Sequence, residues 1–195
     1  MAKILLYIHG LGSNGRSLKV VKLRQELAAE NIDLIAPDLP VDASQAMSII
    51  RSLIHELYQK GDLEKLVICG TSLGGFYASY WGELLDAPYV LINPSITPSI
   101  SLDKYVNNET AIDFETGKPL NITCEMLAVF KLHEDVMNTV SKRLANVYLT
   151  KDDDVLPYQG ALNKYPNAIV YETGGHRFEA GWDTVVARCK ELLNK

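Results

Sequence analysis

The chain has 195 residues, 47% of them hydrophobic and 22% charged, and its formal net charge is −5. This length and composition favour one soluble domain over residues 1–195, with a core large enough to fold without disulfides or metal ions. The net negative charge, and the lack of a Lys and Arg cluster in the sequence, argue against nucleic acid as the main partner.

The alternation of apolar runs and helical periodicity predicts the elements in chain order. The expected strands are residues 3–8, 32–36, 64–69, 89–92, 147–150 and 168–171, and the expected helices are residues 17–30, 42–59, 73–86, 124–144, 159–165 and 184–194. Strand and helix in turn predict a mainly parallel sheet with helices on both faces. In such sheets the ligand binds beyond the carboxyl ends of the strands.

Residues 94–123 break this rhythm, since they are rich in Pro, Ser, Thr and Asn. We interpret residues 94–144 as an insertion after the fourth strand. It is expected to form a small lid or one wall of a substrate pocket, and the alternative is a helix that merely packs on the sheet.

The cysteines and the apolar runs bear on where the protein works. Cys69, Cys124 and Cys189 are odd in number and widely spaced, which suits a reducing compartment and does not resemble a metal site. The first apolar run is too short for the core of a secretory leader. No stretch approaches the ~20 apolar residues of a membrane span. We therefore predict a cytoplasmic protein.

The loop after the third expected strand carries a nucleophile motif. Residues 70–74, Gly-Thr-Ser-Leu-Gly, fit G-x-S-x-G between a strand and a helix, the context in which the motif forms a sharp turn. Such a turn strains the serine and projects its hydroxyl into the site. We predict Ser72 as the nucleophile and the Leu73 N–H, at a helix N-terminus, as an oxyanion donor. The alternative is a glycine-rich turn with a capping serine.

A serine nucleophile needs a base, and the base needs an acid that orients it. On this kind of sheet the chain order is serine, acid, histidine. Asp152, Asp153 and Asp154 follow the fifth expected strand, and His176 follows the sixth. We predict His176 as the base and Asp153 as the acid, with Asp154 next and Asp152 last among the alternatives.

The first strand runs into Ile8-His9-Gly10-Leu11-Gly12-Ser13-Asn14-Gly15-Arg16-Ser17, which is close to the phosphate-binding G-x-x-x-x-G-K-[ST]. Arg16 replaces the lysine, and no later strand ends in a usefully placed aspartate, so we reject that function. The loop instead resembles the oxyanion loop of α/β-hydrolases, with Leu11 as the second N–H donor. Gly10 and Arg16 are further candidates for substrate contacts, Arg16 for a carboxylate or phosphate.

The sequence as a whole resembles the small bacterial esterases of the YqiA type, within the α/β-hydrolase superfamily. The resemblance rests on Ile-His-Gly-Leu-Gly-Ser-Asn-Gly-Arg-Ser-Leu-Lys, Gly-Thr-Ser-Leu-Gly-Gly-Phe-Tyr-Ala, Leu-Ile-Asn-Pro-Ser, Asp-Asp-Val-Leu-Pro-Tyr and Gly-Gly-His-Arg-Phe, in that order. It implies a three-layer α/β-hydrolase fold, in which a mainly parallel sheet of about six strands, in the order 2-1-3-4-5-6, has helices on both faces. After the acid the chain departs from the family pattern, which is closer to Asp-Glu-Val-Leu-Asp.

The predicted function is that of a serine hydrolase of carboxylic esters, with acyl thioesters as an open alternative. Its catalytic residues would be Ser72, Asp153 and His176, with Leu11 and Leu73 as oxyanion donors and no metal or organic cofactor. The partner would be a small-molecule ester or thioester, and the protein a monomer or small homo-oligomer. The alternatives are a non-catalytic ligand-binding protein of the same fold and an acyltransferase to an acceptor other than water.

Overall fold

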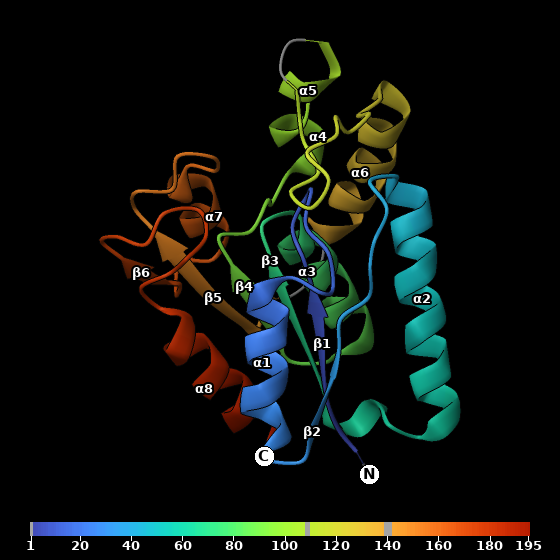
Figure 1. Cartoon of the computed structure of the whole chain (residues 1–195), viewed down its shortest axis with the longest axis vertical. Helices are drawn as coiled ribbons and strands as arrows, with labels where there is room; N and C mark the ends of the chain where they lie inside the picture. The colour runs from blue at the N-terminus through green and yellow to red at the C-terminus, as the bar shows by residue number, and fades with distance from the viewer. Residues whose placement is uncertain (1, 108–109, 139–141) are drawn as a thin grey trace.

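The computed structural model describes residues 2–107, 110–138 and 142–195, and the chain forms a sheet covered by helices on both faces (Figure 1). The strands are β1 (Lys3–Ile8), β2 (Ile32–Ile35), β3 (Leu66–Thr71), β4 (Tyr89–Ile92), β5 (Ala145–Thr150) and β6 (Ile169–Tyr171). The longer helices are α1 (Leu18–Ala28), α2 (Ala43–Lys60), α3 (Leu73–Leu85), α6 (Cys124–Met137), α7 (Tyr158–Lys164) and α8 (Trp182–Leu193). The short helical turns are η1 (Leu63–Lys65), α4 (Pro98–Ser101) and α5 (Lys104–Asn107).

All strand pairs are parallel, and the sheet order is β2-β1-β3-β4-β5-β6, which confirms the predicted topology. Parallel pairing brings the carboxyl ends of the strands to one edge, where the loops after β1, β3, β5 and β6 meet. Those loops carry the predicted site residues. The sheet therefore explains how residues far apart in sequence reach the same place.

Two apolar layers fill the space between the sheet and its helices. Alternate residues of β1 point to opposite faces: Leu6 and Ile8 pack with α2, α3 and α6, whereas Leu5 and Tyr7 pack with α1 and α8. Because both faces are covered, the central strands are continuous apolar runs, and all four residues of β4 are buried. The result is the three-layer architecture expected from the sequence.

Helix α2 shows how local sequence sets the ends of an element. The Asp42 side chain accepts a hydrogen bond of 2.8 Å from the Gln45 N–H and so caps the N-terminus. Gly61 ends the helix in the left-handed conformation, with φ 73°. These two residues account for the close agreement with the predicted helix over residues 42–59.

In the segment 94–144, α4 and α5 lie above the carboxyl edge of the sheet, at the top of Figure 1. The helix predicted over residues 124–144 is shorter than expected: it ends at Met137, and residues 142–144 are not helical, while 139–141 lie outside the described residues. Its apolar residues Met126, Leu127 and Phe130 are buried in the core beside α3. Helices α2 and α3 cover these side chains, which therefore face the core and not a substrate.

Within the described ranges 2–107, 110–138 and 142–195, the helices fall short of the length and apolar character needed to cross a bilayer.

Candidate active site

Ser72 lies on a strained turn between β3 and α3. Its backbone has φ 54° and ψ −123°, a left-handed conformation that is uncommon for a residue with a side chain. The glycines on either side make the turn possible. A Cβ on Gly70 would lie 2.1 Å from the Gly74 carbonyl oxygen, and one on Gly74 would lie 2.1 Å from the Ile8 carbonyl oxygen. Only hydrogen at these positions allows β1, β3 and α3 to approach this closely.

His176 contacts Ser72 with one ring nitrogen and Asp153 with the other. The Nε2 atom lies 3.0 Å from the Ser72 Oγ, and the Nδ1 atom lies 2.9 Å and 2.8 Å from the two carboxylate oxygens of Asp153. A carboxylate beside Nδ1 keeps the proton on that nitrogen, so Nε2 accepts the hydrogen bond from the serine hydroxyl. The structure thus brings the predicted serine, histidine and aspartate into one hydrogen-bonded chain.

The three consecutive aspartates have different surroundings. The Asp153 side chain is 1% exposed, and its Oδ1 also accepts hydrogen bonds from the Val155 and Leu156 N–H groups, at 2.9 and 2.8 Å. Asp152 is exposed and accepts from the Gly175 and Gly174 N–H groups, which lower the pKa of Asp152. Asp154 is exposed. Asp153 therefore contacts the imidazole, and Asp152 fixes the glycine turn before it.

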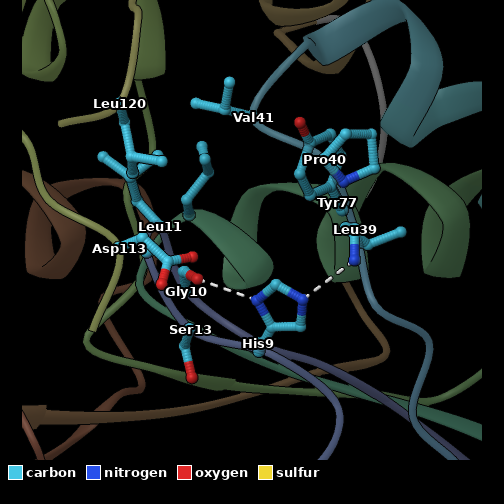
Figure 2. A pocket seen from close by; sticks show the side chains of 12 residues that line it. His9, Gly10, Leu11, Ser13, Leu39, Pro40, Val41, Tyr77, Asp113 and Leu120 are labelled. Carbon is cyan, nitrogen blue, oxygen red and sulfur yellow. Dashed lines mark hydrogen bonds between the residues drawn. The ribbon is translucent and has the colours of Figure 1, made fainter. Parts of the chain in front are cut away.

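The loop after β1 is held by His9. Its Nδ1–H donates to the Gly10 carbonyl oxygen at 2.8 Å, and its Nε2 accepts from the Leu39 N–H at 3.1 Å, as Figure 2 shows. Burial lowers the pKa of His9, which keeps the ring neutral. Both nitrogens have partners, so His9 braces the loop. A Cβ on Gly10 would lie 3.1 Å from the Ser72 Cβ, which shows how closely the loop approaches the serine.

A cavity of about 240 Å³ opens beside Gly10 and Leu73. It is lined by His9, Gly10, Leu11, Gly12, Ser13, Leu39, Pro40, Val41, Leu73, Tyr77, Asp113 and Leu120 (Figure 2). Both predicted oxyanion donors, Leu11 and Leu73, are in this wall. Leu73 is the first residue of α3, so its N–H has no partner within the helix. Asp113 and Leu120 belong to the segment 94–144.

Arg16 lies on the rim of the same loop. Its guanidinium pairs with the carboxylates of Asp38 and Glu115, the latter at 3.4 Å, and the side chain is 67% exposed. Exposed pairs of this kind contribute little to stability. The two carboxylates do neutralise the positive charge of Arg16 to which a substrate anion would bind. The structure therefore pairs Arg16 with protein carboxylates, whereas the sequence suggested a substrate carboxylate or phosphate.

Asn93, which the sequence analysis did not single out, supports the histidine loop. It follows β4 with φ 41° and is 3% exposed. Its Nδ2 donates to the Thr150 Oγ1 and to the carbonyl oxygens of Gly175 and His176, at 3.1, 3.0 and 3.3 Å. Its Oδ1 accepts from the Thr150 N–H at 2.9 Å. One side-chain amide therefore joins β4, β5 and the backbone of His176. The sequence offers little indication of this role, apart from the Asn93-Pro94 pair at the end of a strand.

We expect Asn93→Asp to lower kcat by about tenfold or more with little change in KM, because a carboxylate cannot donate to the oxygens that hold His176. The loss of stability should be about 1–3 kcal/mol, since buried polar groups lose their partner. Steady-state kinetics and thermal unfolding measure the two effects.

Asn146→Asp is the matched control, because the Asn146 amide also donates to two carbonyl oxygens, those of Tyr89 and Leu144, at the opposite end of β5. It should reduce stability without the loss of kcat. Equal kcat values for the two variants would contradict the role given to Asn93.

The sheet order, the helices on both faces and the strained serine turn define the α/β-hydrolase fold. The fold is shared with the Butyrivibrio proteoclasticus protein Est1E, solved with ferulic acid, at a TM-score of 0.76, 13% identity, and 98% and 88% coverage of this chain and of that one. It is also shared with a monoacylglycerol lipase of Paleococcus ferrophilus, at a TM-score of 0.70, 18% identity, and 98% and 94% coverage.

The family follows from the sequence itself. Residues 4–191 match the model of the family described as "Uncharacterised protein family (UPF0227)". A member from Yersinia pseudotuberculosis serotype O:1b is 30% identical over 187 residues, which cover 90% of this chain and 91% of the relative. The chain belongs to the UPF0227 family.

Proposed function

We propose that the protein is a serine hydrolase of carboxylic esters that acts through an acyl-enzyme. The observation that carries the proposal is the chain of hydrogen bonds from the Ser72 Oγ through the two nitrogens of His176 to Asp153. A ligand-binding protein has no need of all three groups in this order, whereas ester cleavage does. The names of Est1E's ligand, ferulic acid, and of the Paleococcus lipase agree with ester chemistry on this fold.

The proposed reaction has two acyl transfers. His176 Nε2 takes the proton of the Ser72 hydroxyl while Oγ bonds to the ester carbonyl carbon, and the carbonyl oxygen becomes an oxyanion. The N–H groups of Leu11 and Leu73 stabilise that charge, each by about 3 kcal/mol. The oxyanion collapses, the bond to the leaving oxygen breaks, and His176 gives the proton to the alcohol. Water then repeats the sequence on the acyl-serine and releases the acid.

The buried acid serves this proton transfer. Because Asp153 is closed off from water and receives two backbone N–H bonds, it stays in place beside Nδ1. It holds the ring in the orientation that points Nε2 at the serine, and it stabilises the imidazolium that forms when the proton arrives. The His176 side chain is 20% exposed, and the proposed mechanism requires its Nε2 to reach the leaving group.

Two finer points are part of the proposal. Part of the segment 94–144 forms one wall of the substrate site, since Asp113 and Leu120 line the cavity and the Phe114 N–H donates to the Gly12 carbonyl oxygen at 2.7 Å. Acyl thioesters fit the same mechanism, because His176 can protonate a thiolate as well. Esters and thioesters of one acid, compared by kcat/KM, distinguish the two leaving groups.

Covalent labelling tests the function. We expect a fluorophosphonate probe to modify Ser72 at one equivalent per chain, which intact mass and peptide mapping measure. Labelling should slow by at least about 100-fold in His176→Ala, since the base activates the hydroxyl. No adduct on Ser72 at high probe concentration would favour the ligand-binding alternative. Product analysis with added alcohols would reveal an acyltransferase, because the ester of the added alcohol would replace the free acid.

A further inference from the structure

The cavity beside Ser72 lies on one side of the reacting atoms. Its wall contains both oxyanion donors, Leu11 and Leu73, and it adjoins Ser72 through Gly10, where a Cβ would lie 3.1 Å from the Ser72 Cβ. Ser72, His176 and Asp153 are themselves not among the residues described as lining it. The leaving group has to lie next to His176 Nε2, which protonates it. The part of an ester that enters the cavity is therefore the acyl group, and this step rests on the function proposed above.

The size and charge of the cavity restrict that acyl group. The volume of about 240 Å³ equals about eight water molecules at liquid density, so a short chain fits. Aliphatic side chains make up most of the wall, and its ionisable groups are His9, Asp113 and Tyr77. His9 is neutral with both nitrogens bonded. Hydrogen bonds from the Thr116 N–H and hydroxyl lower the pKa of Asp113, which keeps it anionic. A neutral acyl group is favoured over an anionic one.

The Tyr77 side chain places a hydroxyl group in a buried position, where it forms no hydrogen bond with the residues described. The residue is 2% exposed, and its ring packs against those of Phe76 and Phe130, with ring centroids 5.8 and 6.0 Å away. Within the described part of the chain its hydroxyl has no hydrogen-bond partner. Burial raises the pKa of Tyr77, so the hydroxyl stays protonated and can both donate and accept. Buried polar atoms without partners are rare and call for an explanation.

We propose that the Tyr77 hydroxyl is the specificity determinant of the acyl site, and that it hydrogen-bonds a neutral oxygen substituent, a ketone or hydroxyl, on a short acyl chain. Tyr77 follows Leu73 by one turn of α3, about 5 Å of rise, on the wall of the same cavity. We place the substituent about three or four carbons from the ester carbonyl to match that spacing. The hydroxyl is covered in the structure, and Leu39, Pro40 and Val41 form the adjoining irregular wall (Figure 2). Binding of the acyl group includes a small outward shift of that wall.

Matched esters test the proposal. The p-nitrophenyl esters of 4-oxopentanoate and 4-methylpentanoate have the same number of non-hydrogen atoms and differ in the ketone, and 5-oxohexanoate with 5-methylhexanoate extends the comparison by one carbon. We expect the wild-type protein to prefer one ketone over its methyl counterpart by about tenfold in kcat/KM, equivalent to about 1.4 kcal/mol. Tyr77→Phe should abolish this preference, because kcat/KM for the ketone ester falls to the level of its methyl counterpart.

Two controls separate recognition from structure. Tyr80→Phe removes a hydroxyl from the same helix, from a ring that packs on Trp81 and His133 instead of lining the cavity, and it should keep the ketone preference. Tyr77→Phe should not lower the melting temperature, because the hydroxyl has no partner to lose. A lower melting temperature with an unchanged ketone preference would overturn the proposal and give the hydroxyl a structural role.

The remaining outcomes also decide the matter. If wild type hydrolyses both series without a preference for either ketone, the acyl-site proposal is wrong and the ester hydrolase stands. If neither series is hydrolysed and the fluorophosphonate leaves Ser72 unmodified, the proposed function fails and the acyl site fails with it. Labelling of Ser72 thus tells the two failures apart.

Discussion

Ser72→Ala is expected to lower kcat for p-nitrophenyl esters by about 10⁶-fold, to the level set by binding and the oxyanion donors alone. The reason is that no other hydroxyl occupies the position 3.0 Å from His176 Nε2 among the residues described. Stopped assays with purified protein, checked for contaminating esterase by the fluorophosphonate probe, measure the residual rate.

The fold should survive this change. Alanine has the same unfavourable left-handed backbone as serine at this position, so the strain at φ 54° is retained and the melting temperature should shift by only a few degrees. Ser52→Ala is the matched control, because the Ser52 hydroxyl bonds the Ser48 carbonyl oxygen on the exposed surface of α2. Activity in Ser72→Ala close to that of Ser52→Ala would rule out the nucleophile.

The second large effect concerns the acid. Asp153→Asn is expected to reduce kcat by about 10⁴-fold, since an amide can donate to Nδ1 and hold the imidazole in the tautomer that leaves Nε2 protonated. The backbone N–H bonds from Val155 and Leu156 can still reach the amide oxygen, so the loop keeps its shape. Single-turnover kinetics should place the loss in acylation and not in binding.

The neighbouring aspartates provide the comparison. Asp152→Asn should cost about tenfold or less, because it weakens the hold on the Gly174-Gly175 turn without changing the contact to the ring. Asp154→Asn should leave kcat unchanged, since that side chain is exposed. If Asp154→Asn gave the largest loss of the three, the acid would have to be reassigned.

Much of the architecture could be predicted from the sequence, because its signals are local. The apolar run 89–92 has no polar residue to offer a solvent-facing side, and it forms a strand with those bounds. Asp42 and Gly61 mark the ends of α2 through a side-chain cap and a left-handed turn. The glycines at positions 70 and 74, on either side of Ser72, predict the sharp turn, because a side chain at either position would clash with the backbone.

Helix ends without such signals were less predictable. The apolar pattern in residues 124–144 continues past the point where the helix stops at Met137. The same pattern could not tell whether Met126, Leu127 and Phe130 face substrate or protein, because burial depends on which neighbours cover the helix. Here those neighbours include α2 and α3, which come from an earlier part of the chain, and α4.

What the sequence by itself determined is the kind of protein: a parallel sheet with Ser72, an aspartate group and His176 on the loops after the third, fifth and sixth strands. What only the tertiary structure decided is which groups meet. Three adjacent aspartates are equivalent in sequence, and the fold sends Asp153 inward to His176 and leaves Asp152 on the glycine turn. Asn93 and Arg16 likewise take partners distant in sequence. Local patterns encode backbone conformation, whereas such contacts depend on how the layers pack.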